Sequence, residues 1–428
     1  MKLFDNYLDG ISNIVRENKI QNFSSFSGDS RLPQYFEKAI VNETQTLQRG
    51  NETNKVLIEF DKSQLTTLFG PNPHSFNNTS IGSHPDFEGL SYSEFEKHYC
   101  VSMFMDIKGS TRLNEKYDLF QIRKIKDTIL TLAIHVASHF GGHVHRLQGD
   151  GIFLQFVRRN QKEQDAVINA LNTASILSHF ISSDLAEIFT NNGVRPLRVR
   201  IGIDLGYKED VVWSHYGIPG CSELTTTSLH TDLAAKLQAL AKSNGILVGE
   251  NIQEILDIKS DFCQNCSDQE GKPDYYIYQG FKNYKKYEFN WQNYLNSFDF
   301  VRRTSNSIEI EEPRIKLICK ISRPDSDIKL DYYQNSFAIE KGSKIEYQIV
   351  ENGHPYYKRD WETIEWKAVN SGKEAKEASE LVHDFGKKNN NKIICETNAG
   401  YVGHHHVECL IKKSHSDNLR LKFPIYVK

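Results

Sequence analysis

Two acidic residues in glycine-bearing turns carry the main chemical signal of this chain. Asp106 closely follows an apolar run at residues 101–104, and Asp150 lies between two glycines further along. Each turn comes after a run that predicts a short strand, so we expect the two carboxylates at adjacent strand ends. Carboxylate oxygens are hard ligands, and such a pair can bridge two Mg²⁺ or Mn²⁺ ions against a nucleotide triphosphate.

The segment after Asp106 offers a place for phosphate groups. It contains Lys108, Gly109, Ser110 and Thr111, which precede a long helical stripe of apolar residues. The first backbone N–H groups of a helix have no partner within it and attract phosphate. We therefore expect this segment to open the long helix and to cradle the phosphates.

These residues also have ordinary structural interpretations. Asp106 and Asp150 can be turn residues, because Asp is favoured in turns. Arg146 can be a solvated strand residue. Asp232 and Lys236, four residues apart on one expected helix face, can be a surface ion pair worth roughly a few tenths of a kcal/mol. The combined order of the segments favours the functional interpretation.

The surrounding elements predict an α+β sandwich with helices on one face of a mostly antiparallel sheet. In chain order we expect a strand at 101–104, a helix at 122–140, a hairpin at 144–147 and 152–156, a helix at 166–181, a strand at 197–203, a helix at 229–240 and a strand at 246–248. The hairpin places Asp150 at its tip.

The chain divides into four expected segments. Residues 1–95 carry mixed helical patterning, as at 35–40, and include a stretch rich in turn formers at 71–80. The sandwich occupies 96–255, a linker 256–300, and a β-rich domain with alternating apolar residues 301–428.

Composition narrows the class of protein. Lys plus Arg (52) nearly balances Asp plus Glu (55), which favours neither a nucleic-acid nor a membrane partner. Seven cysteines without framework spacing favour a reducing compartment. No window approaches the roughly 20 apolar residues of a membrane span. We expect a soluble cytoplasmic protein.

Three segments resemble the class III nucleotide cyclases, over about residues 98–250. They are Phe104–Thr111, Arg146–Phe156 and Thr231–Gln238. The resemblance implies a head-to-tail homodimer with two shared active sites. It also implies two divalent ions at Asp106, Ile107 and Asp150, and attack of the ribose 3′-OH on the α-phosphate to give a 3′,5′-cyclic nucleotide and pyrophosphate.

The chain departs from the purine cyclases at the positions that contact base and ribose. Arg146 stands where they carry a base-reading Lys, and Thr225 occupies the other base-reading position. Asp232 replaces the ribose-orienting Asn, and Lys236 replaces the Arg that stabilises the transition state. Lys keeps the positive charge but loses bidentate geometry. We therefore expect Arg146, Thr225 and Gly109 to Thr111 to bind substrate, and Asp232 and Lys236 to act in catalysis.

These changes resemble the Pycsar pyrimidine cyclases of bacterial anti-phage defence. The segments 366–375 and 401–409 resemble the adenylyl/guanylyl cyclase sensor domain found on some such enzymes, over about residues 300–428. The resemblance implies an enzyme that makes cyclic CMP or cyclic UMP after infection. It further implies an unidentified phage-derived activator and a separate effector that the product opens.

The choice of pyrimidine rests on Arg146 and Thr225. An Arg guanidinium can donate to both O2 and N3 of cytosine, whereas N3 of uracil is itself a donor. The Thr225 hydroxyl can accept from the cytosine 4-amino group or donate to O4 of uracil. We favour CTP as substrate and cyclic CMP as product. The alternatives are a uridylate cyclase acting on UTP and a non-catalytic, nucleotide-binding cyclase-like sensor.

Overall fold

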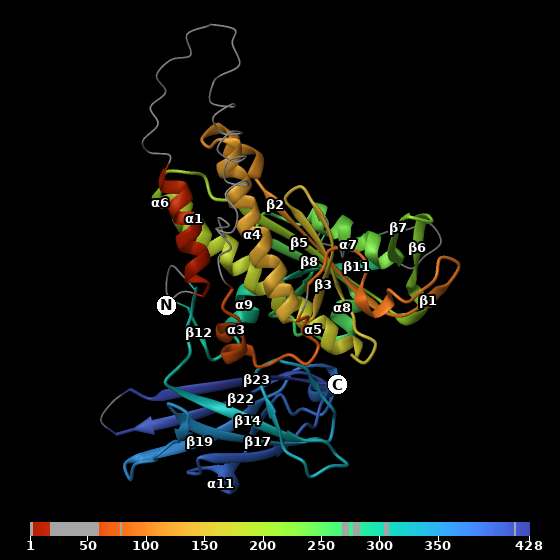
Figure 1. Cartoon of the computed structure of the whole chain (residues 1–428). Helices are drawn as coiled ribbons and strands as arrows, with labels where there is room; N and C mark the ends of the chain where they lie inside the picture. The colour runs from red at the N-terminus through yellow and green to blue at the C-terminus, as the bar shows by residue number, and fades with distance from the viewer. Residues whose placement is uncertain are drawn as a thin grey trace, which may run out of the picture.

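The computed structural model describes residues 3–17, 60–77, 79–267, 274–276, 283–303, 308–414 and 417–428. Figure 1 shows a body of helices around a twisted sheet, with a β-sandwich beneath it. The fold is therefore α+β with a β-rich C-terminal region, as the sequence predicts. The domain boundaries expected from the sequence remain a proposal.

The upper body is built on an eight-stranded sheet with the order β10-β11-β8-β5-β2-β4-β3, and β9 pairs with β11. All pairings are antiparallel except β5 with β8. The strands are β2 (Cys100–Lys108), β3 (Gly142–Gln148), β4 (Gly151–Phe156), β5 (Arg198–Gly206), β8 (Gly245–Gly249), β9 (Cys263–Asn265), β10 (Tyr275–Tyr276) and β11 (Tyr284–Phe289). The expected hairpin, β3–β4, is confirmed.

Helices cover both faces of this sheet, which corrects the prediction of one covered face. Ile246 and Val248 of β8 join the main core, whereas Leu247 between them packs in a separate cluster with Leu237 and Ala241. Successive side chains of a strand point to opposite faces. The helix α7 (Leu229–Leu240) therefore lies on the face opposite the main core.

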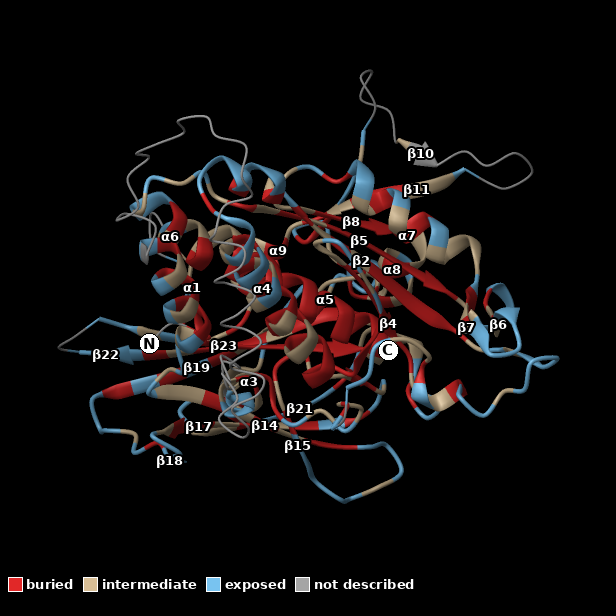
Figure 2. Cartoon of the chain, turned by 45° about the horizontal axis from the view of Figure 1, so that its top comes forward, coloured by how far each residue is buried: buried red, intermediate tan, exposed pale blue. Residues whose placement is uncertain are grey.

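The main core lies under α4 (Leu119–His139) and α5 (Glu163–His179), and both follow the predicted apolar stripes. Figure 2 shows α5 as a mostly buried helix at the centre of the molecule. The other elements here are α1 (Asp5–Glu17), α3 (Lys62–Phe69), the 3₁₀ turns η1 (Pro85–Phe87), η2 (Ser110–Glu115) and η4 (Lys208–Asp210), the π-helical η3 (Phe180–Asp184), and α6 (Leu185–Asn191). Residues 35–40 lie outside the described ranges.

Two features of the upper body are absent from the sequence prediction. A three-stranded arm projects from it, formed by β1 (Phe95–Lys97), β6 (Val212–Ile218) and β7 (Cys221–Thr227). The stretch expected to be a linker, 256–300, instead supplies β9, β11 and α9 (Trp291–Leu295), next to α8 (Glu250–Leu256). Phe289 and Tyr294 are buried there, so this stretch completes the core.

The C-terminal sandwich packs two five-stranded sheets around buried residues such as Tyr347 and Trp366. One sheet contains β14 (Ile315–Ser322), β15 (Leu330–Tyr332), β17 (Lys344–Glu351), β18 (His354–Pro355) and β21 (Ile394–Asn398). The other contains β16 (Ala338–Ile339), β19 (Glu362–Val369), β20 (Val382–Asp384), β22 (Gly403–Lys413) and β23 (Leu419–Val427). Short helices α10 (Lys373–Glu377) and α11 (Gly386–Asn389) flank them, and β12 (Val301–Arg303) with β13 (Ile308–Ile310) forms a separate hairpin.

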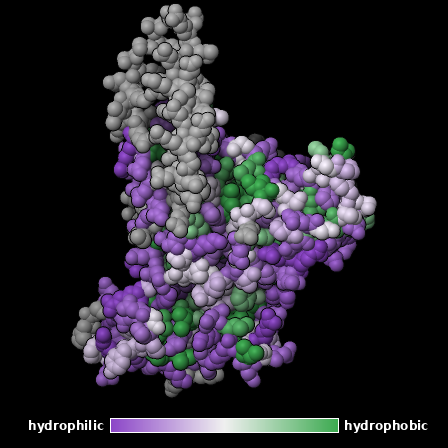
Figure 3. All heavy atoms as spheres, viewed as in Figure 1, coloured by the Kyte–Doolittle hydropathy of each residue, from purple (hydrophilic) through white to green (hydrophobic). Residues whose placement is uncertain are grey.

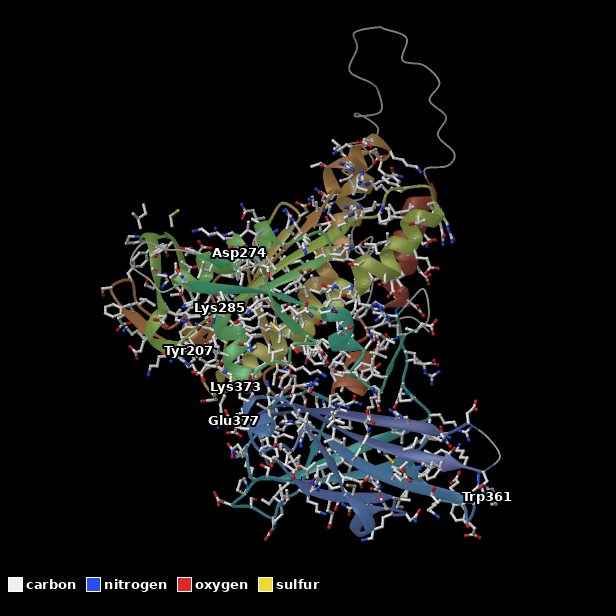
Figure 4. All side chains as sticks on the ribbon, turned by 180° about the vertical axis from the view of Figure 1, so that it is seen from behind. Tyr207, Asp274, Lys285, Trp361, Lys373 and Glu377 are labelled. Atoms are coloured by element: carbon white, nitrogen blue, oxygen red, sulfur yellow. The ribbon has the colours of Figure 1, made fainter. Side chains whose placement is uncertain are left out.

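The two bodies are joined by polar contacts and by shared core. Asn172 of α5 donates to the Asn335 carbonyl at 3.1 Å, and Asp257 accepts from the Lys373 backbone at 2.6 Å. Figure 4 shows Lys373 and Glu377 at the upper edge of the sandwich and Trp361 at its far end. Figure 3 shows a largely hydrophilic face with smaller hydrophobic patches on both bodies. No helix in the described ranges has the length and apolar character to cross a membrane.

Candidate active site

A cavity of about 540 Å³ opens beside the central sheet and the arm. Three of the residues predicted for the site line its wall, namely Asp106 from β2, Arg146 from β3 and Thr225 from β7. The sheet order places β2, β4 and β3 side by side, and β7 reaches over them from the arm. The fold thus gathers residues that are far apart in the sequence.

The metal-binding candidates lie at the end of β2 and at the tip of the neighbouring hairpin. Asp106 lies opposite Gly151 in the β2–β4 ladder, which puts it next to Asp150. Asp106 accepts a hydrogen bond from Arg200 at 2.5 Å, and Asp150 accepts one from Ser110. The two carboxylates thus belong to neighbouring strand ends, and each is hydrogen-bonded to a different side chain.

Ile107 follows Asp106 in β2, and its side chain is buried in the main core. The part of the chain that the structure describes holds no group of three or more His, Cys, Asp or Glu residues arranged for a metal ion. Divalent ions at Asp106 and Asp150 would thus need further oxygen ligands, and a triphosphate carries these.

The phosphate segment differs from the prediction in one respect. Residues 110–115 form the short 3₁₀ helix η2, and the long helix α4 begins only at Leu119, with Asp118 as its N-cap in a capping box. Gly109 adopts φ 95°, a conformation that favours glycine. The segment therefore opens a separate turn, because Asp118 and Gln121 set the start of α4.

A second cavity, of about 810 Å³, lies beside this segment. Gly109 and Thr111 line it together with Lys108, Arg112, Lys116, Arg195 and Arg198. A single acid, Glu115, lines it as well. This concentration of positive charge suits a polyphosphate.

Arg146 and Thr225 belong to a connected polar cluster. Arg146 forms an ion pair with Glu223 of β7, which also lines the cavity. Thr225 lies 3.0 Å from His145 Nε2, and Glu223 lies 3.2 Å from the same nitrogen. His145 is buried, and its Nδ1 lies 3.0 Å from the carbonyl oxygen of Gly82.

The Gly82 contact determines the tautomer of His145. A carbonyl oxygen only accepts, so we assign the ring proton to Nδ1. Burial lowers the pKa of His145 and outweighs the hydrogen bond to Gly82 and the charge of Glu223, which act in the opposite direction. In the neutral ring Nε2 accepts from the Thr225 hydroxyl, whereas the Glu223 carboxylate 3.2 Å away favours a proton on that nitrogen.

Asp232 and Lys236 lie on the exposed face of α7. Neither lines either of the two cavities described above, and α7 contributes Gln238 to the first of them.

A buried network holds the start of α7 against the sheet. Asp204 of β5 lies 2.9 Å from His230 of α7 and accepts from the Tyr284 hydroxyl of β11 at 2.7 Å. Burial by itself would lower the pKa of His230, but its hydrogen bond and charge interaction with Asp204 raise it. The position of the helix that carries Asp232 thus depends on this pair.

Sequence reasoning missed three residues that lie in this site: His145, Arg200 and Glu223. His145 precedes Arg146 in a strand, where alternation predicts that it points away from Arg146. The β-bulge between Val144 and Arg146 changes that alternation. A bulge carries no sequence signal here, so only the three-dimensional fold reveals His145.

The chain is similar to known proteins over most of its length. A cytidylate cyclase from Staphylococcus aureus is 34% identical over 381 residues, covering 87% of this chain and 88% of the relative. A cytidylate cyclase from Escherichia coli is 33% identical over 334 residues, covering 73% and 68%. Residues 289–427 match the adenylyl/guanylyl and SMODS C-terminal sensor domain.

Solved structures also resemble part of the chain. The adenylyl cyclase CyaB from P. aeruginosa is 18% identical, with a TM-score of 0.39, and covers 46% of this chain and 96% of its own. The guanylate cyclase domain of RhGC from Catenaria anguillulae in complex with GTP is 15% identical, with a TM-score of 0.37, and covers 46% and 97%.

Proposed function

We propose, since this chain belongs to the family of the cytidylate cyclases, that it converts CTP into 3′,5′-cyclic CMP and pyrophosphate. The chain is a nucleotide cyclase. The proposal concerns the base of its substrate, the roles of its site residues and its assembly into a dimer. In the reaction the 3′-hydroxyl oxygen loses its proton and bonds to the α-phosphorus. The bond from that phosphorus to the pyrophosphate oxygen breaks.

The observation that carries the choice of CTP is the 3.0 Å contact between Thr225 and His145, in which we assign the hydroxyl as the donor. Because neutral His145 accepts a hydrogen bond from the hydroxyl, the Thr225 oxygen keeps its lone pairs for a donor on the base. Cytosine presents a 4-amino donor, whereas uracil presents an oxygen acceptor. The arrangement therefore supports cytosine, with Arg146 donating to O2 and N3 and Glu223 adding a second acceptor.

Asp106 and Asp150 would hold two divalent ions, together with Ile107. Their donor chemistry fits Mg²⁺ or Mn²⁺, because both side chains offer carboxylate oxygens at one end of the sheet. When bound, the ions lower the pKa of the attacking hydroxyl and neutralise charge on the leaving pyrophosphate. Arg200, hydrogen-bonded to Asp106, holds that carboxylate in place.

The phosphates would lie along the segment of Gly109, Ser110 and Thr111, next to the basic cavity. Asp232 and Lys236 would act from a second copy of the chain, with Asp232 orienting the ribose and Lys236 stabilising charge on the phosphate. This supports a head-to-tail homodimer with two shared sites.

A product assay tests the proposal. Purified protein is incubated with ATP, GTP, CTP and UTP separately in the presence of Mn²⁺, and the products are identified by chromatography. We expect cyclic CMP to predominate. Predominant cyclic UMP would refute the choice of base, and predominant cyclic AMP or cyclic GMP would refute a pyrimidine enzyme.

We also infer a role in anti-phage defence, in which a phage component activates the enzyme and the product opens a separate effector. The support is the cytidylate cyclase family together with the sensor-domain match. Bacteria carrying the gene and its neighbouring effector should resist phage, and the Asp106→Ala version should not. Equal plaque counts for the two strains would contradict this role.

A further inference from the structure

A cavity of about 580 Å³ lies where the upper body meets the sandwich. Its walls come from residues 296–302, which follow α9, from the start of β14 and from the adjoining ends of β22 and β23. Figure 1 shows β12 running down from the region of α9 toward these strands. The residues assigned above to catalysis do not line it.

The cavity is strongly basic. Six cationic side chains line it: Arg302, Arg314, Arg359, Lys413, Arg420 and Lys422. They come from several separate segments, so the fold gathers positive charge that the sequence disperses. Two acids, Asp299 and Glu351, also line the cavity and leave a clear excess of positive charge.

Little of this charge is compensated by ion pairs. Arg314 pairs with Glu351 at 2.7 Å, and Arg420 lies 3.5 Å from Glu408 outside the cavity. Within the described ranges, the other basic residues of this wall form no salt bridge. Like charges held together repel, which favours an anion between them.

Two residues of the cavity wall carry buried hydrogen-bond acceptors without a partner. Oδ1 of Asn296 and Oδ2 of Asp299 are buried and accept no hydrogen bond from the described residues. The other oxygen of Asp299 accepts from Gln334, which fixes the carboxylate. Buried polar atoms are costly without a partner, so these two oxygens would be stabilised by a ligand donor once their side chains turn toward the cavity.

We propose that this cavity binds a nucleotide, meaning a phosphate ester that also carries amino or hydroxyl donors. The basic residues face the phosphate, and the oxygens of Asn296 and Asp299 meet the donors. Phe298, Tyr356 and Leu421 supply apolar wall for a base or sugar. The sensor domain would thereby read a nucleotide at a site separate from the catalytic cavity.

The cavity borders residues 298–300, whose aromatic side chains pack in the core of the upper body. Phe298 lines the cavity and also packs on Phe69 with ring centroids 5.3 Å apart, and Phe300 packs on Phe69 at 5.1 Å. All three side chains belong to the main core. A bound nucleotide would therefore contact the sandwich and the cyclase core together.

Calorimetric titration of the full chain tests the proposal. CMP, UMP, AMP and GMP are titrated separately in EDTA, which removes the divalent ions that catalytic-site binding needs. We expect at least one to bind, and the double variant Arg302→Glu, Arg420→Glu to weaken that binding at least about tenfold. The matched control, Lys344→Glu with Lys412→Glu, changes the same charge on the sandwich outside the cavity and should bind like the wild type.

A second comparison separates a nucleotide site from a general anion site. Asn296→Ala should weaken the nucleotide several-fold and leave the affinity for inorganic phosphate unchanged. The proposal is overturned if no mononucleotide binds at millimolar concentration, if the double variant binds as the wild type does, or if inorganic phosphate binds as tightly as every nucleotide. None of these results depends on which triphosphate the enzyme cyclises.

Discussion

The hydroxyl group of Thr225 has one proton and two lone pairs, and its contact with His145 fixes where the proton points. A buried, neutral histidine that already donates from Nδ1 can only accept at Nε2. The base-reading role that we propose for this position thus depends on a pair of side chains. Neither Thr225 nor His145 alone determines whether this position accepts a hydrogen bond from the base.

Removing the Thr225 hydroxyl tests this pair. Thr225→Val keeps the shape of the side chain but leaves the 4-amino group of cytosine without its acceptor. We expect kcat/KM for CTP to fall about 10- to 100-fold, the cost of one lost hydrogen bond. Thr225→Ser, the matched control, keeps the hydroxyl and should retain most activity. Unchanged CTP turnover in the Val variant would contradict the assignment.

The carboxylates at the strand ends give a second prediction. Asp106→Asn or Asp150→Asn replaces an anionic ligand by a neutral amide, so turnover should fall below detection at any Mn²⁺ concentration. Asp127→Asn, on the exposed side of α4, is the control and should be fully active. Thermal unfolding should be nearly the same for all three variants, and retained activity at either site residue would refute its metal role.

At the scale of elements, α7 packs directly on the sheet at Gly202. A methyl group there would lie 2.2 Å from the Ala234 carbonyl oxygen and from the Gln238 nitrogen. Both are backbone atoms of the helix and cannot move alone. The absence of a side chain in β5 is thus what lets α7 lie close to the strand.

Gly202→Ala should therefore push α7 away from the sheet. We expect a loss of roughly 1–3 kcal/mol in the free energy of unfolding, and a fall in kcat, because α7 carries Asp232 and Lys236. Gly89→Ala is a matched control, since a methyl group there meets nothing within 4 Å. Urea denaturation and steady-state kinetics would measure both, and a fully stable Gly202→Ala protein would disprove the close packing.

The pair of Asp204 and His230 makes the stability of this region depend on pH. Because contact with Asp204 raises the pKa of His230 in the folded protein, its contribution to stability is complete below the ordinary histidine value. It is lost as the pH rises through the raised folded value. His230→Gln should thus reduce stability more at pH 6 than at pH 9, as measured by urea denaturation. An equal difference at both pH values would contradict this coupling.

At the scale of the whole molecule, the sandwich and the upper body share one core. Ala338 and Tyr426 of the sandwich belong to the main hydrophobic cluster, and Tyr294 donates to Asn172 at 2.6 Å beside them. The two bodies should therefore unfold together. The two bodies could unfold separately only if this shared core were broken.

Asn172→Ala tests that joint. It removes buried hydrogen bonds to Asn335 and Tyr294, so we expect a loss of roughly 1–3 kcal/mol. The wild type should show one calorimetric transition, and the variant should show one at lower temperature. Thr128→Ala, half-buried on α4 with its hydroxyl bonded within its own helix, serves as the control. Two well-separated transitions in the wild type would show that the bodies fold independently.

The sequence predicts elements whose pattern is decided locally. The apolar stripe of α4 and the alternation of β5 come from residues that face one core. The arm strands β6 and β7 were missed because exposed residues such as Tyr216 and Ile218 break the alternation. Likewise, β11 looked like a linker because Lys and Tyr dominate it, although Tyr287 and Phe289 are buried by the sheet.

Some residues of the candidate site can likewise be predicted from the sequence, and others cannot. Asp106, Arg146 and Thr225 could be placed in one cavity from strand order and resemblance. His145 and Glu223 could not, because their roles depend on a bulge and on the arm crossing the sheet edge. Contacts made across separate elements leave no periodic signal in the chain.

Gly82 lies in the stretch before the central sheet, and its carbonyl oxygen holds the ring of His145. Gly82 does not line the cavity, yet through the ring of His145 it influences the contact that the Thr225 hydroxyl makes. A shift of this loop would let the ring turn and reverse the polarity of the site. A relative could thus evolve from one pyrimidine to the other without replacing any side chain that contacts the base.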